Sequence, residues 1–284
     1  MKLRKTTSAA ALALATALVL SACGSDDSAN GDGTGGADGG DGGGGTITIG
    51  VKVDQPGLGL QTADNDYVGF DVDVAKYVAA ELGYDEADIE WREAPTPERE
   101  NMLVNGDVDM IFATYSITDE RKERVDFAGP YFVAHQDLLI RADEEVTETD
   151  DINELTLCSV VGSTSAQNVN EKFAPDAQMQ EYSGYSECLT GLENGAVDAL
   201  TTDDSILAGY ASQEAHAGKF KLAGLHLSDE YYGVGLPKGS DQRADVNAAL
   251  QKMIDDGVWA ETVEEHFGPA GYEAADAPEI TETD

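Results

Sequence analysis

The chain has few positive charges. Its 284 residues contain 17 Lys and Arg against 55 Asp and Glu, which gives a formal net charge of −38 at pH 7. Such a charge repels polyanions, so it excludes nucleic acid as a partner and argues against charge-driven binding to anionic lipid. Salt screens this field beyond about 8 to 10 Å. A site for a small anion therefore requires local cations of its own.

Cysteine and histidine are also scarce. The three cysteines show no CxxC spacing, which argues against a zinc or redox centre. The four histidines are scattered, and no HExxH, phosphate-binding loop or nucleophile elbow is present. An acid pair such as Asp203 and Asp204 could do acid–base work, but nothing else supports catalysis. The sequence therefore predicts no metal, no cofactor and no enzyme.

Long apolar segments are confined to the start of the chain. Residues 9–20 are apolar and follow Lys2, Arg4 and Lys5, a pattern typical of a signal peptide that is too short to span a bilayer. The letters LSAC at 20–23 resemble the bacterial lipobox, which implies cleavage before Cys23 and lipidation of its sulfur. An ordinary signal peptide with a spare cysteine is the alternative. We expect a signal peptide at 1–22 and an extracytoplasmic protein, lipid-anchored to the outer face of the cell membrane.

The segment after the signal peptide has no large apolar residue. Residues 24–45 are almost all Gly, Asp, Ser, Ala, Asn and Thr, so they cannot form a core. A Gly-rich coil of this length has a typical reach of about 26 Å. The Asp–Gly repeats lack the regular spacing of a calcium loop. We therefore expect residues 23–45 to be the lipidated cysteine and a flexible tether.

The two remaining cysteines, Cys158 and Cys188, are expected to form a disulfide, because an exported chain meets an oxidising compartment. The closed loop of about 30 residues would stabilise the fold by roughly 3 to 4 kcal/mol in the chain-entropy model. Two buried free thiols are the alternative.

The rest of the chain alternates between segments typical of strands and segments typical of helices, which favours α/β lobes. Asp73 is expected to cap the first helix and Gly83 to end it, with Val74, Val78 and Leu82 on one face. The predicted strands or extended segments are 46–53, 108–113, 132–141, 155–161, 196–201 and 231–236, and the predicted helices are 73–82, 98–104, one from about 165, 186–193, 204–211 and a helical region at 245–267. Two such sets indicate two lobes, between which the chain crosses twice.

Several segments resemble the family 3 extracellular solute-binding proteins of ABC importers for polar amino acids. The similarity runs from about residue 46 to 268. The segments that carry it are VGFDVDVA at 68–75, SITDER at 116–121, DFAGPY at 126–131, VDALTTD at 197–203 and YGVGLPKG at 232–239. Within the family, KVDQPGLG at 52–59 and the two cysteines of the second lobe look most like the glutamate-binding lipoproteins.

This resemblance implies an α/β fold of the two-lobed type II periplasmic-binding-protein class, with a ligand cleft between the lobes and a two-stranded hinge. The expected organisation is lobe 1 at 46–138 plus 232–268, lobe 2 at 139–231, and an acidic C-terminal tail at 269–284. It also implies an ABC permease with its ATPase as partners, alongside the amino acid and the membrane.

A zwitterionic amino acid needs a bidentate cation for its α-carboxylate and a carboxylate for its ammonium group. By resemblance, Arg121 is the carboxylate-binding arginine, Ser116 bonds the polar head of the ligand, and Asp203 binds the ammonium group. Ser163 and Thr164, at a strand-to-helix turn, are expected to supply donors from lobe 2. Asp203 follows a strand, where open α/β sheets bind ligands.

The choice of ligand side chain is expected to depend on Lys52 and Arg99, two cations in a chain that has few. A glutamate γ-carboxylate would pair with them, whereas glutamine would leave a partly desolvated cation unpaired, a difference of about 1.5 to 3 kcal/mol. Pairing of either cation with a nearby acid is the alternative. L-Glutamate is therefore the expected ligand, with aspartate or glutamine as alternatives.

The expected function is that of a substrate-binding lipoprotein of an ABC importer. A receptor that presents the bound amino acid to a sensor protein would have the same site and a different partner. The same fold also carries dehydratases and domains fused to cell-wall lyases, but the candidate site is arranged for a zwitterion and not for catalysis.

Overall fold

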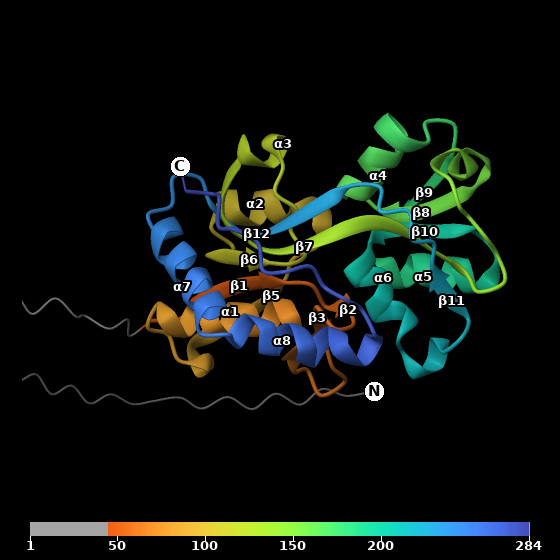
Figure 1. Cartoon of the computed structure of the whole chain (residues 1–284). Coiled ribbons are helices and arrows are strands. Elements are labelled where there is room, and N and C mark those ends of the chain that lie inside the picture. Colours follow the sequence, from red (N-terminus) through yellow and green to blue (C-terminus); the bar gives the residue numbers. More distant parts are fainter. Residues whose placement is uncertain (1–44, 284) are drawn as a thin grey trace, which may run out of the picture. The chain divides into compact units, whose positions relative to one another are not determined.

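The computed structural model describes residues 45–283. The predicted signal peptide, Cys23 and the tether up to residue 44 lie outside the described residues. Within them, helices and strands alternate and form the two α/β lobes that the sequence predicts (Figure 1). No helix in the described part of the chain has the length and apolar character needed to cross a membrane.

The sheet of the first lobe begins with β1 (Ile47–Val51), which is rich in β-branched residues and buried at four of its five positions. It pairs in parallel with β5 (Ile89–Glu93) and with β6 (Met110–Phe112). The carboxyl ends of these parallel strands meet at one edge of the sheet. The segments that follow them, which contain Lys52, Arg99 and Ser116, are thereby brought to the same edge.

The 17-residue strand β7 (Val125–Arg141) connects the lobes. Its residues 125–135 and 136–141 have different pairing partners. The first part pairs antiparallel with β12 (Asp229–Pro237) of the first lobe, which also pairs with β6. From Gln136 on, β7 pairs with β10 (Ala199–Asp203), a strand of the second lobe. The pairing partner therefore changes between His135 and Gln136. Figure 1 shows β7 extending from the first lobe into the second.

The sheet of the second lobe extends outward from β7 and β10. In addition to these two strands it contains β11 (Phe220–Leu222), which pairs with β7, and then β8 (Thr156–Val160) and β9 (Gln178–Tyr182), which follow β10 in the sheet. β8 is parallel to both β10 and β9. The sulfur atoms of Cys158 on β8 and Cys188 on helix α5 (Tyr185–Asn194) lie 2.01 Å apart.

The helices follow the same division. Those of the first lobe are α1 (Phe70–Glu81), α2 (Arg99–Asn105), α3 (Asp119–Lys122), α7 (Arg243–Asp255) and α8 (Val258–Phe267). Those of the second lobe are α4 (Thr164–Asn168), which continues as a π-helical turn, α5 (Tyr185–Asn194) and α6 (Asp204–Ala211). The predicted helix at 204–211 matches α6 at both ends, and the region predicted at 245–267 is two helices separated by Gly257.

The start of the first helix was predicted wrongly at Asp73. The helix begins at Phe70, with Gly69 at the N-cap. Gly69 has a φ of 122°, and a Cβ there would overlap the Leu58 carbonyl, so only glycine fits this turn. The carboxylate of Asp71 accepts bonds from the Thr114 amide at 2.7 Å and the Tyr131 hydroxyl at 2.8 Å. Tertiary contacts, not a local cap, therefore determine where α1 begins.

A small three-stranded sheet, absent from the sequence prediction, lies beside the first lobe. It contains β2 (Asp54–Gln55), β3 (Gly59–Gln61) and β4 (Tyr67–Val68), all antiparallel. Strands of two or three residues show no apolar alternation that could reveal them. This sheet places the segment after Lys52 against the second lobe.

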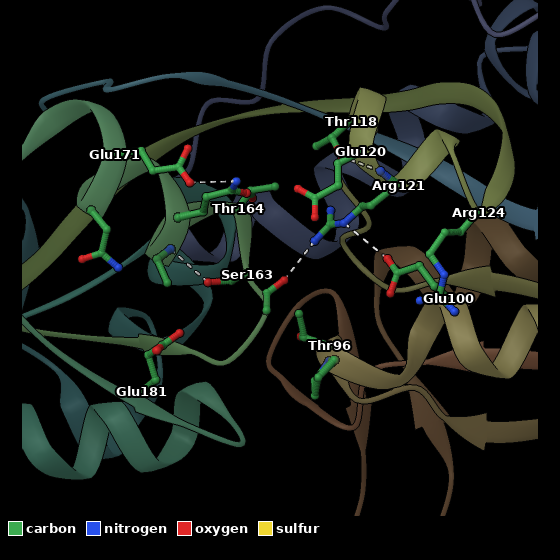
Figure 2. Close-up of a pocket in the computed structure, with 15 residues that line it drawn as sticks. Thr96, Glu100, Thr118, Glu120, Arg121, Arg124, Ser163, Thr164, Glu171 and Glu181 are labelled. Atoms are coloured by element: carbon green, nitrogen blue, oxygen red, sulfur yellow. Dashed lines mark hydrogen bonds and ion pairs between the residues drawn. The ribbon is translucent and has the colours of Figure 1, made fainter.

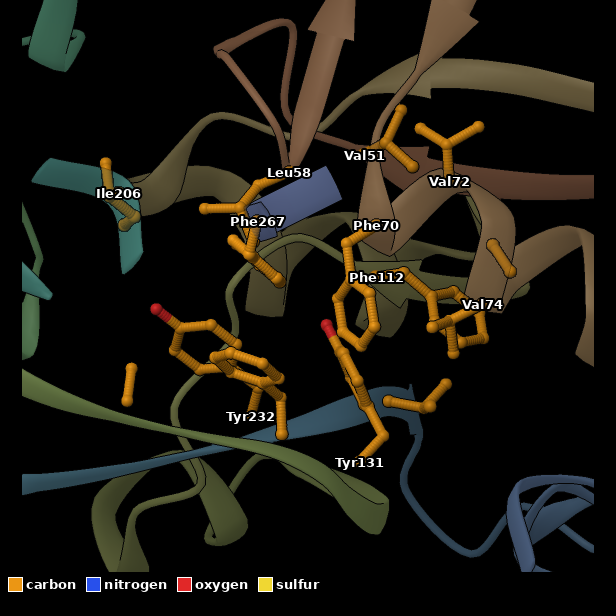
Figure 3. Packing of buried hydrophobic residues seen from close by; sticks show 14 of the residues in the cluster. Val51, Leu58, Phe70, Val72, Val74, Phe112, Tyr131, Ile206, Tyr232 and Phe267 are labelled. Atoms are coloured by element: carbon orange, nitrogen blue, oxygen red, sulfur yellow. The ribbon is translucent and has the colours of Figure 1, made fainter. Parts of the chain in front are cut away.

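Several aromatic rings pack together with aliphatic side chains in the largest core cluster (Figure 3). Phe70 packs against Phe132 and Phe267 at ring-centroid distances of 5.1 and 5.4 Å. Tyr232 stacks on Phe132 at 5.6 Å. The same cluster includes Ile206 of the second lobe. Tyr232 is thereby held rigidly, with its hydroxyl group at the second lobe.

The C-terminal segment after α8 packs onto the first lobe. Tyr272, Ala277 and Ile280 contact the core cluster, and the amide groups of Thr281 and Glu282 both donate to the Gly129 carbonyl at 2.9 and 3.0 Å. The segment expected as an acidic tail thus contacts the first lobe as far as Glu282.

Candidate ligand site between the lobes

A polar cavity lies between the two lobes, at the carboxyl ends of β6 and β10. Its volume is about 10 Å³, so the lining side chains nearly fill it in this structure. Its lining residues from the first lobe are Thr96, Arg99, Thr114, Ser116 and Arg121, and those from the second lobe are Ser163, Thr164, Ser165, Tyr185, Asp203 and Ile206. The structure thus brings six of the seven predicted ligand-binding residues to one cavity, and Lys52 is not among its lining residues.

Arg121 extends from α3 and is fixed by several contacts. The Thr118 hydroxyl caps this helix by accepting from the Arg121 amide at 3.2 Å. The guanidinium donates to the Ser116 carbonyl at 2.7 Å, and its Nε lies 3.5 Å from a carboxylate oxygen of Glu100 (Figure 2). It also donates to the Gly162 carbonyl of the second lobe at 3.3 Å. A guanidinium has five donors, so others are left for a ligand carboxylate.

Arg99 opens α2 and is buried, with 3% of its surface exposed. Its guanidinium donates to the Thr96 hydroxyl at 3.2 Å, while its Nε has no partner within the described residues. The ion pairs nearby join Lys52 to Asp54 and Arg121 to Glu100, and no ion pair in residues 45–283 includes Arg99. Burial first, and then the charge of Arg121, lower the pKa of Arg99. A buried guanidinium without an anion is costly, so this position favours binding of one.

Asp203 ends β10 and is also 3% exposed. The Tyr232 hydroxyl donates to its Oδ2 at 2.6 Å, whereas its Oδ1 has no partner among the described residues. Burial, followed by the charge of Glu230, raises the pKa of Asp203 well above its usual range. A buried acceptor of this kind is suited to a cationic donor such as an ammonium group.

The hydroxyl groups of Ser163 and Thr164 already have protein partners. Ser163 is the N-cap of α4 and accepts from the Ala166 amide at 3.1 Å. Thr164 donates to Glu230 at 3.1 Å. Ser116 uses its carbonyl for Arg121. All three residues line the cavity, and Ser116 holds the Arg121 guanidinium through its carbonyl.

Lys52 lies outside the cavity lining and is 4% exposed. Its ammonium group is 3.6 Å from the Asp54 carboxylate. Burial first, and then the charge of Arg99, lower the pKa of Lys52. The alternative pairing with a nearby acid is therefore the arrangement that the structure contains.

Two aromatic residues in and beside the cavity were not predicted. The ring of Tyr115 lies 5.0 Å from both guanidinium groups, Arg99 and Arg121, within the range of cation–π attraction. Its position next to Ser116, directly after a predicted strand, is the one sequence signal that could have identified it. Tyr185 begins α5 and lines the cavity, but nothing in its sequence context indicates this role.

A wider cleft leads from the cavity to the surface (Figure 2). It has a volume of about 450 Å³ and shares Thr96, Arg121, Ser163 and Thr164 with the cavity. In the described part of the chain, no group of three or more His, Cys, Asp and Glu side chains could hold a metal ion.

Comparison with known proteins supports the same reading of the fold. The family model described as bacterial extracellular solute-binding proteins, family 3, matches residues 47–269. The glutamate-binding protein GluB of Corynebacterium glutamicum is 48% identical over 234 residues, covering 78% of each chain. The ABC transporter glutamine-binding protein GlnH of Bacillus subtilis is 39% identical over 218 residues, covering 76% of this chain and 78% of GlnH.

Among solved structures, an ancestral arginine-binding protein bound to glutamine superposes with a TM-score of 0.72 and 32% identity, covering 79% of this chain and 98% of that one. All three of these proteins bind amino acids according to their names, so the family and not the ligand is what they have in common. The chain belongs to the bacterial extracellular solute-binding proteins of family 3.

Proposed function

We propose that this protein captures an extracellular acidic amino acid, L-glutamate in particular, and delivers it to the permease of an ABC importer. The observation that carries the proposal is Arg99, a buried guanidinium with an unpartnered Nε and no carboxylate partner among residues 45–283. A second carboxylate on the ligand would supply that partner. The name of GluB, the glutamate-binding relative, supports the same ligand.

Each polar group of glutamate has a counterpart in the cavity. Arg121 would hold the α-carboxylate, Asp203 the ammonium group and Arg99 the γ-carboxylate. Lys52 would contribute through its charge, since Asp54 already occupies its ammonium group. Glutamine would leave Arg99 without an anion, at a cost of about 1.5 to 3 kcal/mol. An arginine ligand would place its own guanidinium group against that of Arg99, and the two positive charges would repel each other.

Delivery would depend on lobe closure. Arg121 and Arg99 belong to the first lobe and Asp203 to the second, so a ligand that contacts all three favours the closed arrangement. We propose that lobe 1 comprises 46–138 and 232–268 and lobe 2 comprises 139–231, with the crossing segments of β7 and β12 as the hinge. A permease that contacts both lobes would then distinguish loaded from empty protein.

The proposal is tested by calorimetric titration of ligand-stripped protein with each of the twenty amino acids. L-Glutamate should bind one to one, L-aspartate more weakly, and L-glutamine about ten- to a hundredfold more weakly than glutamate. Tighter binding of glutamine or arginine than of glutamate would refute the assignment of Arg99. Absence of binding by every amino acid would refute the function itself.

A further inference from the structure

A second region of contact joins the lobes outside the ligand cavity. It is formed by residues 54–57, which begin at β2 of the first lobe, and by three residues of the second lobe. These are Gly184, just before α5, and Gly209 and Tyr210 on α6. We call this region the interlobe loop contact. Figure 1 shows β2 on the side of the first lobe nearest α6. The Tyr210 hydroxyl donates to the Asp54 carbonyl at 2.5 Å and lies 3.5 Å from its Oδ2.

The two glycines face this segment at very short range. A Cβ at Gly209 would overlap the Pro56 carbonyl oxygen, and a Cβ at Gly184 would lie 2.7 Å from the Asp54 carboxylate. Real Cβ atoms essentially never approach a neighbour this closely, and the obstacle at Gly209 is backbone that cannot rotate away. Any side chain at Gly209 would therefore displace the segment at Pro56.

The backbone of the second lobe gives no reason for glycine at these positions. Gly209 lies inside α6, where glycine weakens a helix relative to alanine. Gly184 is extended, with φ −144° and ψ 155°, a conformation open to any residue. Their small size matters only where the first lobe approaches. The interlobe contact, and not the fold of the second lobe, therefore explains the glycine at 209.

We propose that Gly209 is a positioning residue for lobe closure: it lets residues 54–57 seat against α6, where Tyr210 then holds Asp54. This contact needs no ligand atom, and its Asp54 is the residue that forms the ion pair with Lys52. It stabilises the closed arrangement in addition to the ligand. The inference rests on the proposed closure around an amino acid.

The test compares Gly209→Ala with Gly191→Ala. Gly191 lies in the last turn of α5, and a Cβ there would meet only the Val197 side chain of the same lobe, at 3.4 Å. Both variants gain the same helix propensity. They differ because the first lobe lies against position 209 and not against position 191. Glutamate affinity, the melting temperature without ligand, and the radius of gyration with and without saturating glutamate are measured for each.

Gly209→Ala should weaken glutamate binding at least tenfold and lose most of the contraction on binding, with a ligand-free melting temperature no lower than that of the parent. Gly191→Ala should bind and contract as the parent does. Gly209→Ala with parental affinity and contraction overturns the inference.

If Gly209→Ala lowers the ligand-free melting temperature, Tyr210→Phe tests the interlobe contact instead. This variant removes one interlobe hydrogen bond and leaves the backbone of α6 unchanged. It should weaken binding about two- to tenfold, and unchanged affinity overturns the inference. A parent protein that binds no amino acid, or does not contract on binding, overturns the proposed function together with this inference. Contraction in both the parent and Gly209→Ala overturns only the role of Gly209.

Discussion

Two guanidinium groups flank one ring in the candidate site. Arg99 and Arg121 each lie 5.0 Å from the centre of the Tyr115 ring. Their charges repel each other, and the charge of Arg121 lowers the pKa of Arg99. Glu100 offsets Arg121 but forms no ion pair with Arg99. A ligand with two carboxylates would neutralise both cations, whereas a ligand with one would leave Arg99 unmatched.

Replacing Arg99 should therefore change selectivity more than general amino-acid binding. Arg99→Met is expected to lower the ratio of glutamate to glutamine affinity by about ten- to a hundredfold, since only the γ-carboxylate loses its partner. Arg92→Met, at an exposed position of β5, is the matched control and should leave the ratio unchanged. Calorimetric titration of each variant with glutamate and with glutamine measures this affinity ratio. A parental ratio in Arg99→Met would contradict the assignment.

Asp203 is expected to make ligand binding sensitive to acid. Its pKa is raised well above the usual range by burial, and an ammonium ligand would bind only the ionised form. Ligand affinity should therefore be complete above this raised pKa and should fall as the pH drops through it. The loss should occur at a higher pH than the protonation of surface aspartates. Titrations across acid pH should show the decline together with proton release on binding. An affinity that is flat until surface carboxylates protonate would contradict this role.

At the scale of elements, the helices and strands that could be predicted are the ones whose residues show a strong apolar pattern. α6 matches at both ends, and β1, β8 and β10 lie where apolar segments predicted strands. α1 starts three residues before Asp73 because Gly69 and Asp71 make tertiary contacts that no local pattern contains. β2, β3 and β4 are too short to show alternation.

The candidate site was predicted from the family resemblance. The segments SITDER and VDALTTD placed Arg121 and Asp203 in it, Asp203 also follows a predicted strand, and the structure brings both residues to one cavity. Tyr185 was missed, because its place in the cavity depends on how α5 packs against the rest of the second lobe. The local ion pair of Lys52 with Asp54 depends on β2, which was also missed.

A disulfide between Cys158 and Cys188 would join β8 to α5, behind the loop that carries Ser163. The intact mass of the exported protein should be two hydrogens below the fully reduced value. The Cys158→Ala, Cys188→Ala double variant should lose about 3 to 4 kcal/mol of stability in denaturant unfolding, less if the native bond is strained. Two thiols that alkylate freely in denaturant without reductant would show that the bond is absent.

At the scale of the whole molecule, the proposed delivery to a permease requires the binding domain to stay close to the membrane. We propose that a lipid on Cys23 and the Gly-rich segment after it provide this tether. Cys23→Ser in the full-length precursor should move the protein from the membrane fraction to the medium or soluble fraction, with glutamate affinity unchanged. Equal membrane retention of parent and variant would show that the anchor lies elsewhere.

Closure of two lobes on one ligand is the central claim, and it requires the ligand to contact both. Arg99 and Arg121 come from the first lobe, and Asp203 comes from the second, where Tyr232 of β12 orients it. Neither lobe alone presents both signs of charge to a zwitterion in this cavity. We therefore expect recognition of the ligand to be coupled to closure of the lobes.

The crystal structure of the glutamate complex measures this coupling directly. It should show the α-carboxylate within hydrogen-bond distance of Arg121, the ammonium group on Asp203 Oδ1 and the γ-carboxylate on Arg99, with both lobes in contact with the ligand. A glutamate whose γ-carboxylate points away from Arg99, or which contacts one lobe only, would contradict the account.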